Sequence, residues 1–148
     1  MTTTTRLKTF EYTTTTSWTG DRTGIIGSGG KTDVRVASPP EFKGIPGVWT
    51  PEDLYVAAID LCHMTTFLAF AARKGIALKE YSSAARGVLE FAEGGYRFTK
   101  VVLSPTIVVG AGADRALVAA AVEEAHQNCL IGRSVTAEVE IRPAIITE

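Results

Sequence analysis

The first third of the chain carries the residue pattern of short strands. Residues 6–18 are rich in threonine and aromatic side chains, a composition that favours β-structure. A turn is predicted over residues 20–24, and residues 23–27 and 31–37 predict two further strands joined at Ser28-Gly29-Gly30. Residues 38–50 contain three prolines and two glycines and therefore predict a loop.

A long helix is predicted after this loop, from Thr50 as N-cap to about Lys74, with Gly75 as its left-handed stop. Residues 54–72 are apolar on nearly every face, and Asp60 and His63 are the main exceptions. A helix that is apolar all round must be buried on all sides. One small domain rarely surrounds so long a helix, so we expect a second subunit to cover part of it.

The second half of the chain predicts two more strands, a helix and a closing strand. The runs at residues 76–91 and 96–109 favour β-structure and are joined at Glu93-Gly94-Gly95. Asp114 is placed to cap a helix that runs to about Leu130 and is closed by Gly132, and residues 135–141 predict a last strand. The order βββ-α-ββ-α-β predicts a single α+β domain over residues 1–148, with helices packed on a largely antiparallel sheet.

Composition narrows the class of protein. The chain has 148 residues, 45% of them hydrophobic and 21% charged, as in an ordinary soluble domain with one core. The net charge of −1 gives no electrostatic signal for nucleic acid or an anionic membrane. No uninterrupted apolar run approaches the roughly 20 residues of a membrane span, and residues 1–16 lack the apolar core of a signal peptide. We therefore expect a cytoplasmic protein with reduced thiols and no nucleic-acid or membrane partner.

The rarest residues carry the candidate chemistry. The chain has two cysteines and two histidines, and they occur as Cys62-His63 and as His126-x-x-Cys129, each pair on a predicted helix. A buried cysteine is commonly an inert small hydrophobe, and this interpretation stays open for each thiol. The four residues are also a legitimate zinc set, although adjacent helical positions diverge and suit one ion poorly.

Thiol-based peroxide reduction sets a different requirement. A thiolate must attack the peroxide, and a cation must lower the pKa of that thiol in an apolar pocket. A carboxylate must hold the cation, and a second thiol must capture the sulfenic acid before it is oxidised further. The required set is thus two cysteines, an arginine and a carboxylate.

Four segments of the chain match a known family in order. They are Gly20-Asp21-Arg22-Thr23-Gly24, Ser38-Pro39-Pro40-Glu41, Thr50-Pro51-Glu52-Asp53-Leu54 followed by Ala57, Ala58 and Cys62, and Ala125-His126-x-x-Cys129. The sequence resembles the osmotically inducible protein C and organic hydroperoxide resistance (OsmC/Ohr) superfamily. Its Gly-Asp-Arg-Thr-Gly turn, and Leu130 after Cys129, depart from the strongest organic-hydroperoxide members. The Trp18-x-Gly20 pattern and His63 after the first cysteine are more similar to the OsmC branch or the broader OsmC-like group.

The resemblance implies a role for each matched residue. It implies that Cys62 is the peroxidatic thiol, Cys129 the resolving thiol, Arg22 the activating cation and Glu52 the carboxylate that pairs with it. It also implies an OsmC-like fold in an intertwined homodimer that reduces organic hydroperoxides under oxidative or osmotic stress. A lipoyl-type dithiol or a small thiol would restore the cysteines, and no cofactor is needed. The alternative is an OsmC-like ligand-binding, metal-binding or scaffold protein with little peroxidase activity.

Helix geometry adds two expectations. Glu52 and Cys62 are ten positions apart on one predicted helix, about 15 Å along its axis, so Glu52 and Arg22 would serve Cys62 of the other subunit. His126 lies one turn before Cys129 and is placed to tune that thiol, whereas His63 points about 100° away from Cys62.

Overall fold

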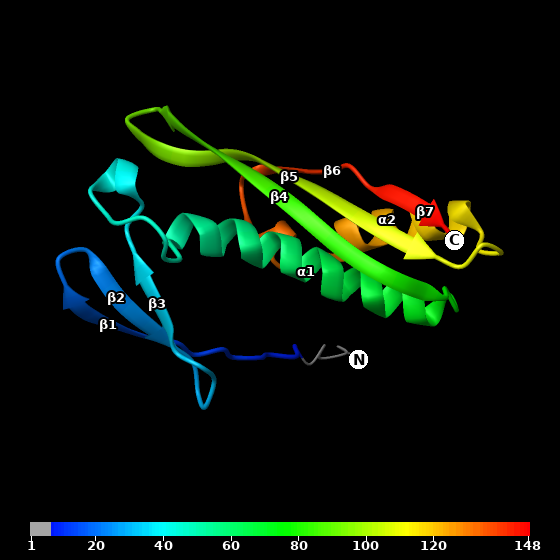
Figure 1. The fold of residues 1–148 in the computed structure, drawn as a ribbon, viewed down its shortest axis with the longest axis horizontal. Helices are drawn as coiled ribbons and strands as arrows, with labels where there is room; N and C mark the ends of the chain where they lie inside the picture. The colour runs from blue at the N-terminus through cyan, green and yellow to red at the C-terminus, as the bar shows by residue number, and fades with distance from the viewer. Residues whose placement is uncertain (1–6) are drawn as a thin grey trace, which may run out of the picture. The chain divides into compact units, whose positions relative to one another are not determined.

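The computed structural model describes residues 7–148, and its elements follow the predicted order with one additional strand. In chain order they are β1 (Thr15–Gly20), β2 (Thr23–Gly27), β3 (Val34–Ala37), η1 (Pro40–Phe42), α1 (Pro51–Arg73), β4 (Leu78–Ala92), β5 (Gly95–Val109), α2 (Arg115–Asn128), η2 (Gly132–Ser134), β6 (Glu138–Ile141) and β7 (Ala144–Thr147). The α+β class is confirmed (Figure 1). The first predicted strand is shorter than expected: Arg6 lies outside the described residues, and β1 begins only at Thr15.

The chain divides into two compact units, Met1–Glu52 and Asp53–Glu148, which are described here one at a time. The first unit contains the strands β1 to β3 and the second contains nearly all of α1 and every later element. The single OsmC-like domain expected over residues 1–148 stays a prediction.

The first unit is a three-stranded antiparallel sheet in the order β1-β2-β3. The turn between β1 and β2 is held by two side chains. The Trp18 indole N–H donates to the carbonyl of Asp21 at 2.9 Å, and the Thr23 hydroxyl donates to the carbonyl of Gly20 at 2.6 Å. Gly20 and Asp21 both adopt positive φ, at 125° and 44°. These contacts fix the short segment that presents Arg22.

The second unit contains a mixed sheet rather than the largely antiparallel one predicted. β4 and β5 form a long antiparallel hairpin, but β6 and β7 both run parallel to β5. The reason is topological, because α2 carries the chain back along the sheet, and such a crossover joins parallel strands. The predicted closing strand, residues 135–141, corresponds to β6. The additional strand β7 follows it after Arg142-Pro143, where proline supplies no N–H for a ladder.

The core of the second unit lies where α1 and α2 pack on β5. Phe67 of α1, Ile107 of β5 and Val118 of α2 are fully buried in one cluster, and Ile59 and Leu103 are central to a second. Burying such a side chain contributes about 1.5–3 kcal/mol. Positions 101, 103, 105, 107 and 109 of β5 are almost completely buried and have the two-residue period of one strand face, and Val102 and Val108 on the other face are buried as well.

Helix α1 approaches β4 closely enough to require a glycine. A Cβ added at Gly87 would lie 2.5 Å from Cγ2 of Val56 and 2.9 Å from the ring of Phe98. The absence of a side chain at position 87 therefore lets the helix lie against the hairpin, which it follows in Figure 1.

The ends of the two helices largely agree with the sequence signals. Gly75, at φ 67°, has the left-handed conformation expected after α1. The Asp114 carboxylate accepts from the amides of Ala116 and Leu117, as expected of the α2 N-cap. The predicted C-terminus of α2 is wrong by two residues: the helix ends at Asn128, Cys129 is its C-cap, and Gly132 begins a 3₁₀ turn.

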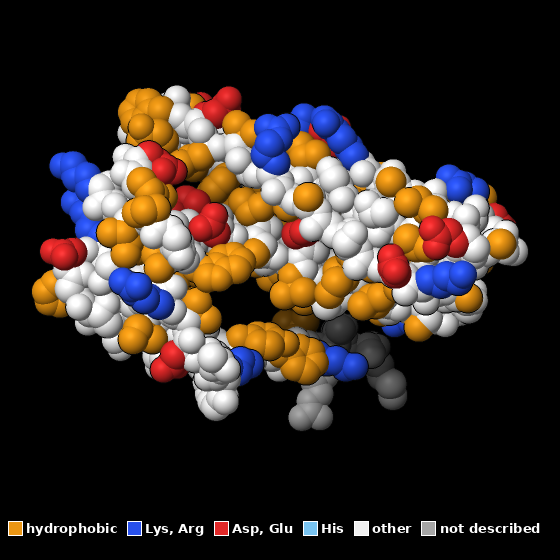
Figure 2. Space-filling model, in the orientation of Figure 1, with side chains coloured by type: hydrophobic (Ala, Val, Ile, Leu, Met, Phe, Trp, Pro, Cys, Tyr) orange, Lys and Arg blue, Asp and Glu red, His pale blue; other side chains and the backbone are white. Residues whose placement is uncertain are grey.

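Helix α1 is less buried in one chain than its composition requires. Its buried residues are Ile59, His63, Phe67 and Ala71, whereas Leu61 is 57% and Leu68 38% exposed. Figure 2 shows hydrophobic side chains at the surface along this helix. By length and composition alone α1 is also able to cross a membrane, with a mean hydropathy of 1.5 in its most apolar window. Core helices of soluble proteins pass the same test, so the expected absence of a membrane partner stays a prediction.

Candidate active site

The two cysteines, far apart in the chain, meet within the second unit. Cys62 lies in the middle of α1 and is half-buried, and Cys129 is the buried C-cap of α2. The two side chains lie close enough for each to shift the pKa of the other, and both cysteines are free. The packing of α1 against α2 thus places the two thiols near each other.

The surroundings of Cys62 favour its thiolate. Burial alone raises the pKa of Cys62, but four hydrogen bonds oppose it, and the net pKa is lowered. The donors are the backbone amide of Ile131, the thiol of Cys129, the hydroxyl of Thr66 and the backbone amide of Leu130. The Thr66 oxygen lies 4.0 Å from the sulfur, one helical turn along α1. Hydrogen bonding to a charged form stabilises it, so Cys62 is the more acidic thiol.

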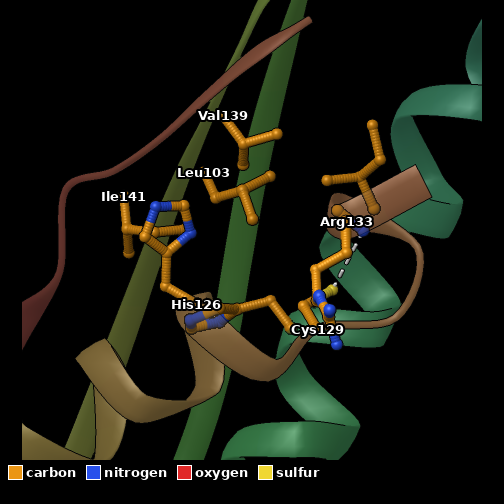
Figure 3. A pocket seen from close by; sticks show the side chains of 9 residues that line it. Leu103, His126, Cys129, Arg133, Val139 and Ile141 are labelled. Carbon is orange, nitrogen blue, oxygen red and sulfur yellow. Dashed lines mark hydrogen bonds between the residues drawn. The ribbon is translucent and has the colours of Figure 1, made fainter. Parts of the chain in front are cut away.

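The surroundings of Cys129 have the opposite effect. The pKa of Cys129 is raised to about 11, chiefly by burial and also by the hydrogen bond to Cys62 and the charge of Cys62. The amide of Gly132 donates to the Cys129 sulfur at 3.4 Å and lowers the pKa in part (Figure 3). At neutral pH, therefore, Cys129 is a protonated thiol.

A small apolar cavity of about 80 Å³ adjoins Cys129. Figure 3 shows Leu103, Val139 and Ile141 on its sheet side, with His126 and Arg133 completing the wall near Cys129. Ile59, His63 and Gly132 line the remainder. The buried thiol is thus next to a space that accepts hydrocarbon better than water.

His63 is buried, and both nitrogens of its ring contact groups of the fold. It is 1% exposed, its Nε2 lies 3.3 Å from the carbonyl oxygen of Val122, and its Nδ1 lies 3.4 Å from the hydroxyl of Tyr81. A carbonyl only accepts, so Nε2 carries the proton and Nδ1 accepts from Tyr81, whose pKa burial raises to about 12. His63 therefore joins α1 to α2 and β4, and neither ring contact is with a thiol.

His126 lines the same cavity as Cys129. Figure 3 shows its side chain extending from the last turn of α2 toward Ile141. The predicted role of His126 in tuning Cys129 stays a prediction.

The zinc interpretation gains no support from the arrangement of the four residues. Within residues 7–148, no group of three or more histidine, cysteine or acidic side chains is arranged to hold a metal ion. Both His63 nitrogens are within hydrogen-bonding distance of protein groups, which leaves this residue a poor ligand.

Arg22 lies in the first unit, in the turn between β1 and β2. It lines a polar pocket of about 290 Å³, together with Arg35 and Lys43. No ion pair of these three side chains occurs within the described part of the chain. The Arg22 guanidinium is therefore an exposed cation without an ion-pair partner among the described residues.

Glu52 is the second residue of α1 and the last of the first unit. Its Oε2 atom is buried and has no hydrogen-bond partner among residues 7–148. A buried acceptor without a donor costs about 1–3 kcal/mol, so a cationic partner for this carboxylate would stabilise the fold.

Sequence reasoning missed the donors to Cys62. Thr66 is four residues after Cys62, a spacing at which helical side chains meet, so this signal was present. The Leu130 and Ile131 donors are backbone amides, which leave no trace in the residue types.

This site and fold define a class: an α+β protein with two unequal thiols in contact beside an apolar cavity. Residues 44–143 match the family described as OsmC-like protein. The chain belongs to the OsmC-like family, which confirms the resemblance inferred from its motifs.

Relatives share the fold over nearly the whole chain. The sequence is 26% identical over 132 residues to the uncharacterized protein YmaD of Bacillus subtilis (strain 168), covering 85% of this chain and 87% of that protein. An OsmC-like protein of unknown function from Vibrio cholerae O1 biovar eltor str. N16961 superposes with a TM-score of 0.84 and 25% identity, covering 91% of this chain and 99% of that one. An organic hydroperoxide resistance protein from Legionella pneumophila gives a TM-score of 0.73 and 22% identity, covering 95% and 99%.

Proposed function

We propose that this protein is a thiol-dependent peroxidase that reduces organic hydroperoxides in the oxidative or osmotic stress response. The observation that carries the proposal is the contact between Cys62 and Cys129, whose pKa values are shifted in opposite directions. Peroxide reduction by a dithiol needs this inequality, because one sulfur must attack as the thiolate while the other waits as the thiol.

The reaction balances without a prosthetic group. The Cys62 thiolate attacks the distal peroxide oxygen, so an S–O bond forms, the O–O bond breaks and the departing alkoxide takes a proton to become the alcohol. The sulfur becomes a sulfenic acid. Cys129 then loses its proton and attacks that sulfur, forming the disulfide and releasing water. A lipoyl-type dithiol or two small thiols reduce the disulfide and are themselves oxidised.

Arg22 and Glu52 complete the site in this proposal. Arg22 stabilises the thiolate and the developing alkoxide, and Glu52 holds the guanidinium. Two observations support these roles: Arg22 has no ion-pair partner among the described residues, and the buried Oε2 of Glu52 has no donor. Because Glu52 and Cys62 are ten residues apart on one helix, we expect Glu52 and Arg22 to act on the Cys62 thiol of a second subunit.

A homodimer in the cytoplasm is the form in which this site would operate. The exposed apolar residues of α1, Leu61 and Leu68 among them, need a cover, and a second copy of the chain supplies one. The cytoplasm keeps thiols reduced, which the resting state of both cysteines requires.

Organic hydroperoxides are the substrate class because the cavity next to Cys129 is mainly apolar. The Legionella pneumophila protein of the same fold, described as an organic hydroperoxide resistance protein, agrees with this assignment.

Peroxide consumption by purified variants tests the proposal. With cumene hydroperoxide and a dithiol, Cys62→Ser should remove turnover, and Cys129→Ser should permit one reaction per chain followed by over-oxidation of Cys62. Equal turnover by the wild type and Cys62→Ser would contradict the peroxidase function and favour a ligand-binding or scaffold role.

A further inference from the structure

The polar pocket of the first unit brings three cations together. Its volume is about 290 Å³, and its lining includes Arg22, Arg35 and Lys43, with Asp21 as the acidic residue of that lining. All three cations are exposed, and none of them forms an ion pair with another residue of the range 7–148. Three positive charges and one negative charge leave the lining with a net formal charge of +2. Like charges in one small region repel, so an anion in this pocket would be stabilised.

Backbone hydrogen bonds position Lys43 at the pocket that Arg22 lines. The Ser38 amide donates to the carbonyl of Arg22 at 3.1 Å, which joins the segment after β3 to the turn between β1 and β2. The Lys43 amide donates to the carbonyl of Pro40 at 3.1 Å and closes the 3₁₀ turn η1. The same pocket is therefore lined from two segments that the backbone itself connects.

Lys43 has a backbone conformation that a lysine rarely adopts. Its φ of 65° lies in the left-handed region. The next residue cannot relax this turn, because a Cβ added at Gly44 would lie 1.4 Å from the carbonyl oxygen of Ser38. The Gly44 amide also donates to the carbonyl of Pro39 at 3.0 Å. The loop itself therefore fixes the position of Lys43.

Arg35 reaches the pocket from the sheet. It lies in β3 and pairs with Ile25 of β2, while Ala37 pairs with Thr23. Residues two apart on a strand share a face, so Arg35 lies on the face that carries Thr23. Thr23 lines the same pocket. The sheet thus sets the place of the third cation.

The two threonine hydroxyls of the pocket use their protons within the turn. The Thr23 hydroxyl donates to the carbonyl of Gly20 at 2.6 Å. The Thr19 oxygen lies 2.9 Å from that of Thr23, and since a hydroxyl has one proton, Thr19 is the donor of this second bond. The pocket therefore offers a ligand its guanidinium and ammonium groups rather than its hydroxyl protons.

We propose that this pocket binds a phosphoryl group, either as free phosphate or as part of a phosphomonoester. A phosphoryl group carries close to two negative charges at neutral pH, which matches the net charge of the lining. Guanidinium groups present a planar fork that suits phosphate oxygens, and the ammonium of Lys43 adds a point charge. The site goes beyond the proposed function, in which Arg35 and Lys43 have no part.

The chain offers a matched set of variants. Arg35→Gln and Lys43→Gln each remove one cation of the pocket and leave Arg22 in place. Lys31→Gln is the control, because Lys31 belongs to the same unit and carries the same charge but does not line the pocket. The Lys31 ammonium instead donates to the hydroxyl of Ser28 at 3.1 Å.

The measurement is a titration of the full-length protein with inorganic phosphate at pH 7.5 and low ionic strength, followed by the amide shifts in ¹H–¹⁵N NMR spectra. Saturable shifts should concentrate at residues 19–23 and 43–45. Arg35→Gln and Lys43→Gln should each raise the Kd about fivefold, as expected for the loss of one exposed ion pair. Lys31→Gln should stay within about twofold of the wild type. The spectra also show whether each variant is folded.

A parallel titration with glycerol 3-phosphate distinguishes the two sources of the phosphoryl group. Tighter binding of the ester than of phosphate would assign the pocket to a phosphomonoester, and tighter binding of phosphate would assign it to the free ion. Either result supports the site.

Two results would overturn the site. One is a set of shifts spread over lysines and arginines throughout the chain. The other is an equal loss of affinity in Lys43→Gln and Lys31→Gln, which would indicate general attraction by charge. Succinate that binds at the same amides as tightly as phosphate would contradict the assignment to a phosphoryl group. Phosphate binding by a protein that consumes no peroxide would contradict the proposed function and leave this site intact.

Discussion

The Cys129 thiol, at the end of α2, lies near the sulfur of Cys62 in the middle of α1, and each shifts the pKa of the other. The same contact lowers the pKa of one thiol and raises that of the other. In the proposed mechanism, this difference suits the pair to two different steps, attack by Cys62 and later resolution by Cys129.

The resolving step should depend strongly on pH. Once Cys62 is a sulfenic acid, its negative charge no longer raises the pKa of Cys129, but burial, the largest cause of the shift, persists. Cys129 must lose a proton to attack, so disulfide formation should accelerate as pH rises, by up to about tenfold per pH unit while the thiolate is scarce. Trapping with dimedone should capture more sulfenic acid at pH 6 than at pH 9.

The Cys129→Ser variant provides the control for this experiment. Its sulfenic acid has no internal competitor, so its dimedone yield measures the pH dependence of the probe itself. A wild-type yield that follows the variant at every pH would show that Cys129 does not resolve the sulfenic acid.

Buried His63 should make the fold sensitive to acid. Burial lowers its pKa, His126 adds to this, and the bond to Val122 and the charges of Asp60 and Glu123 oppose it. Below pH 6.5 the unfolded chain therefore binds a proton at this position that the folded chain does not. The free energy of unfolding should therefore decrease as the pH is lowered through that range, by up to about 1.4 kcal/mol per pH unit.

Urea unfolding at pH 7.5 and 5.5 measures this effect, with His63→Gln as the comparison. The variant should be less stable than the wild type at pH 7.5, because it loses fitted contacts to Val122 and Tyr81. It should also lose less stability between the two pH values. An equal loss in both proteins would remove His63 as the cause.

The exposed face of α1 should control dimer formation. Leu68 of α1 and Leu117 of α2 are 38% and 37% exposed, so they form a matched pair. Leu68→Glu should shift sedimentation toward the monomer, since it places a charge in the proposed apolar interface, and Leu117→Glu should not. A wild type that sediments as a monomer and is fully active would contradict the two-chain site.

Mixed dimers test whether Arg22 acts on the thiol of the partner subunit. An Arg22→Gln chain paired with a Cys62→Ser chain contains one intact combination of arginine and thiol only if the two come from different subunits. Co-refolding the two inactive variants should then restore up to about a quarter of wild-type activity, because about half of the dimers are mixed and each has one working site. No recovery would place Arg22 and Cys62 of the same chain in one site, or remove Arg22 from it.

Local signals account for the parts of this fold that the sequence predicts well. The Thr50-Pro51 start and Gly75 stop of α1, and the Asp114 cap of α2, depend on residues within a turn of each other. The parallel pairing of β6 and β7 with β5 depends on where α2 returns the chain, which no local pattern encodes. The apolar composition of α1 predicts that a single chain does not surround this helix, and Leu61 and Leu68 are indeed exposed in one chain.

The candidate site also has parts that the sequence predicts and parts that it does not. Cys62 and Cys129 stand out because they are rare, yet their contact follows from helix packing between distant segments. The roles of Arg22 and Glu52 come from the family resemblance and remain predictions. The sequence could not single out the backbone amides of Leu130 and Ile131, since every residue type except proline supplies the same donor.

The most direct measurement is mass spectrometry of the reduced protein after one equivalent of cumene hydroperoxide. The account predicts that each chain loses two hydrogens and yields a peptide pair joined through Cys62 and Cys129. A sulfinic acid on Cys62 with Cys129 still a free thiol, or no change in mass at either cysteine, would contradict it.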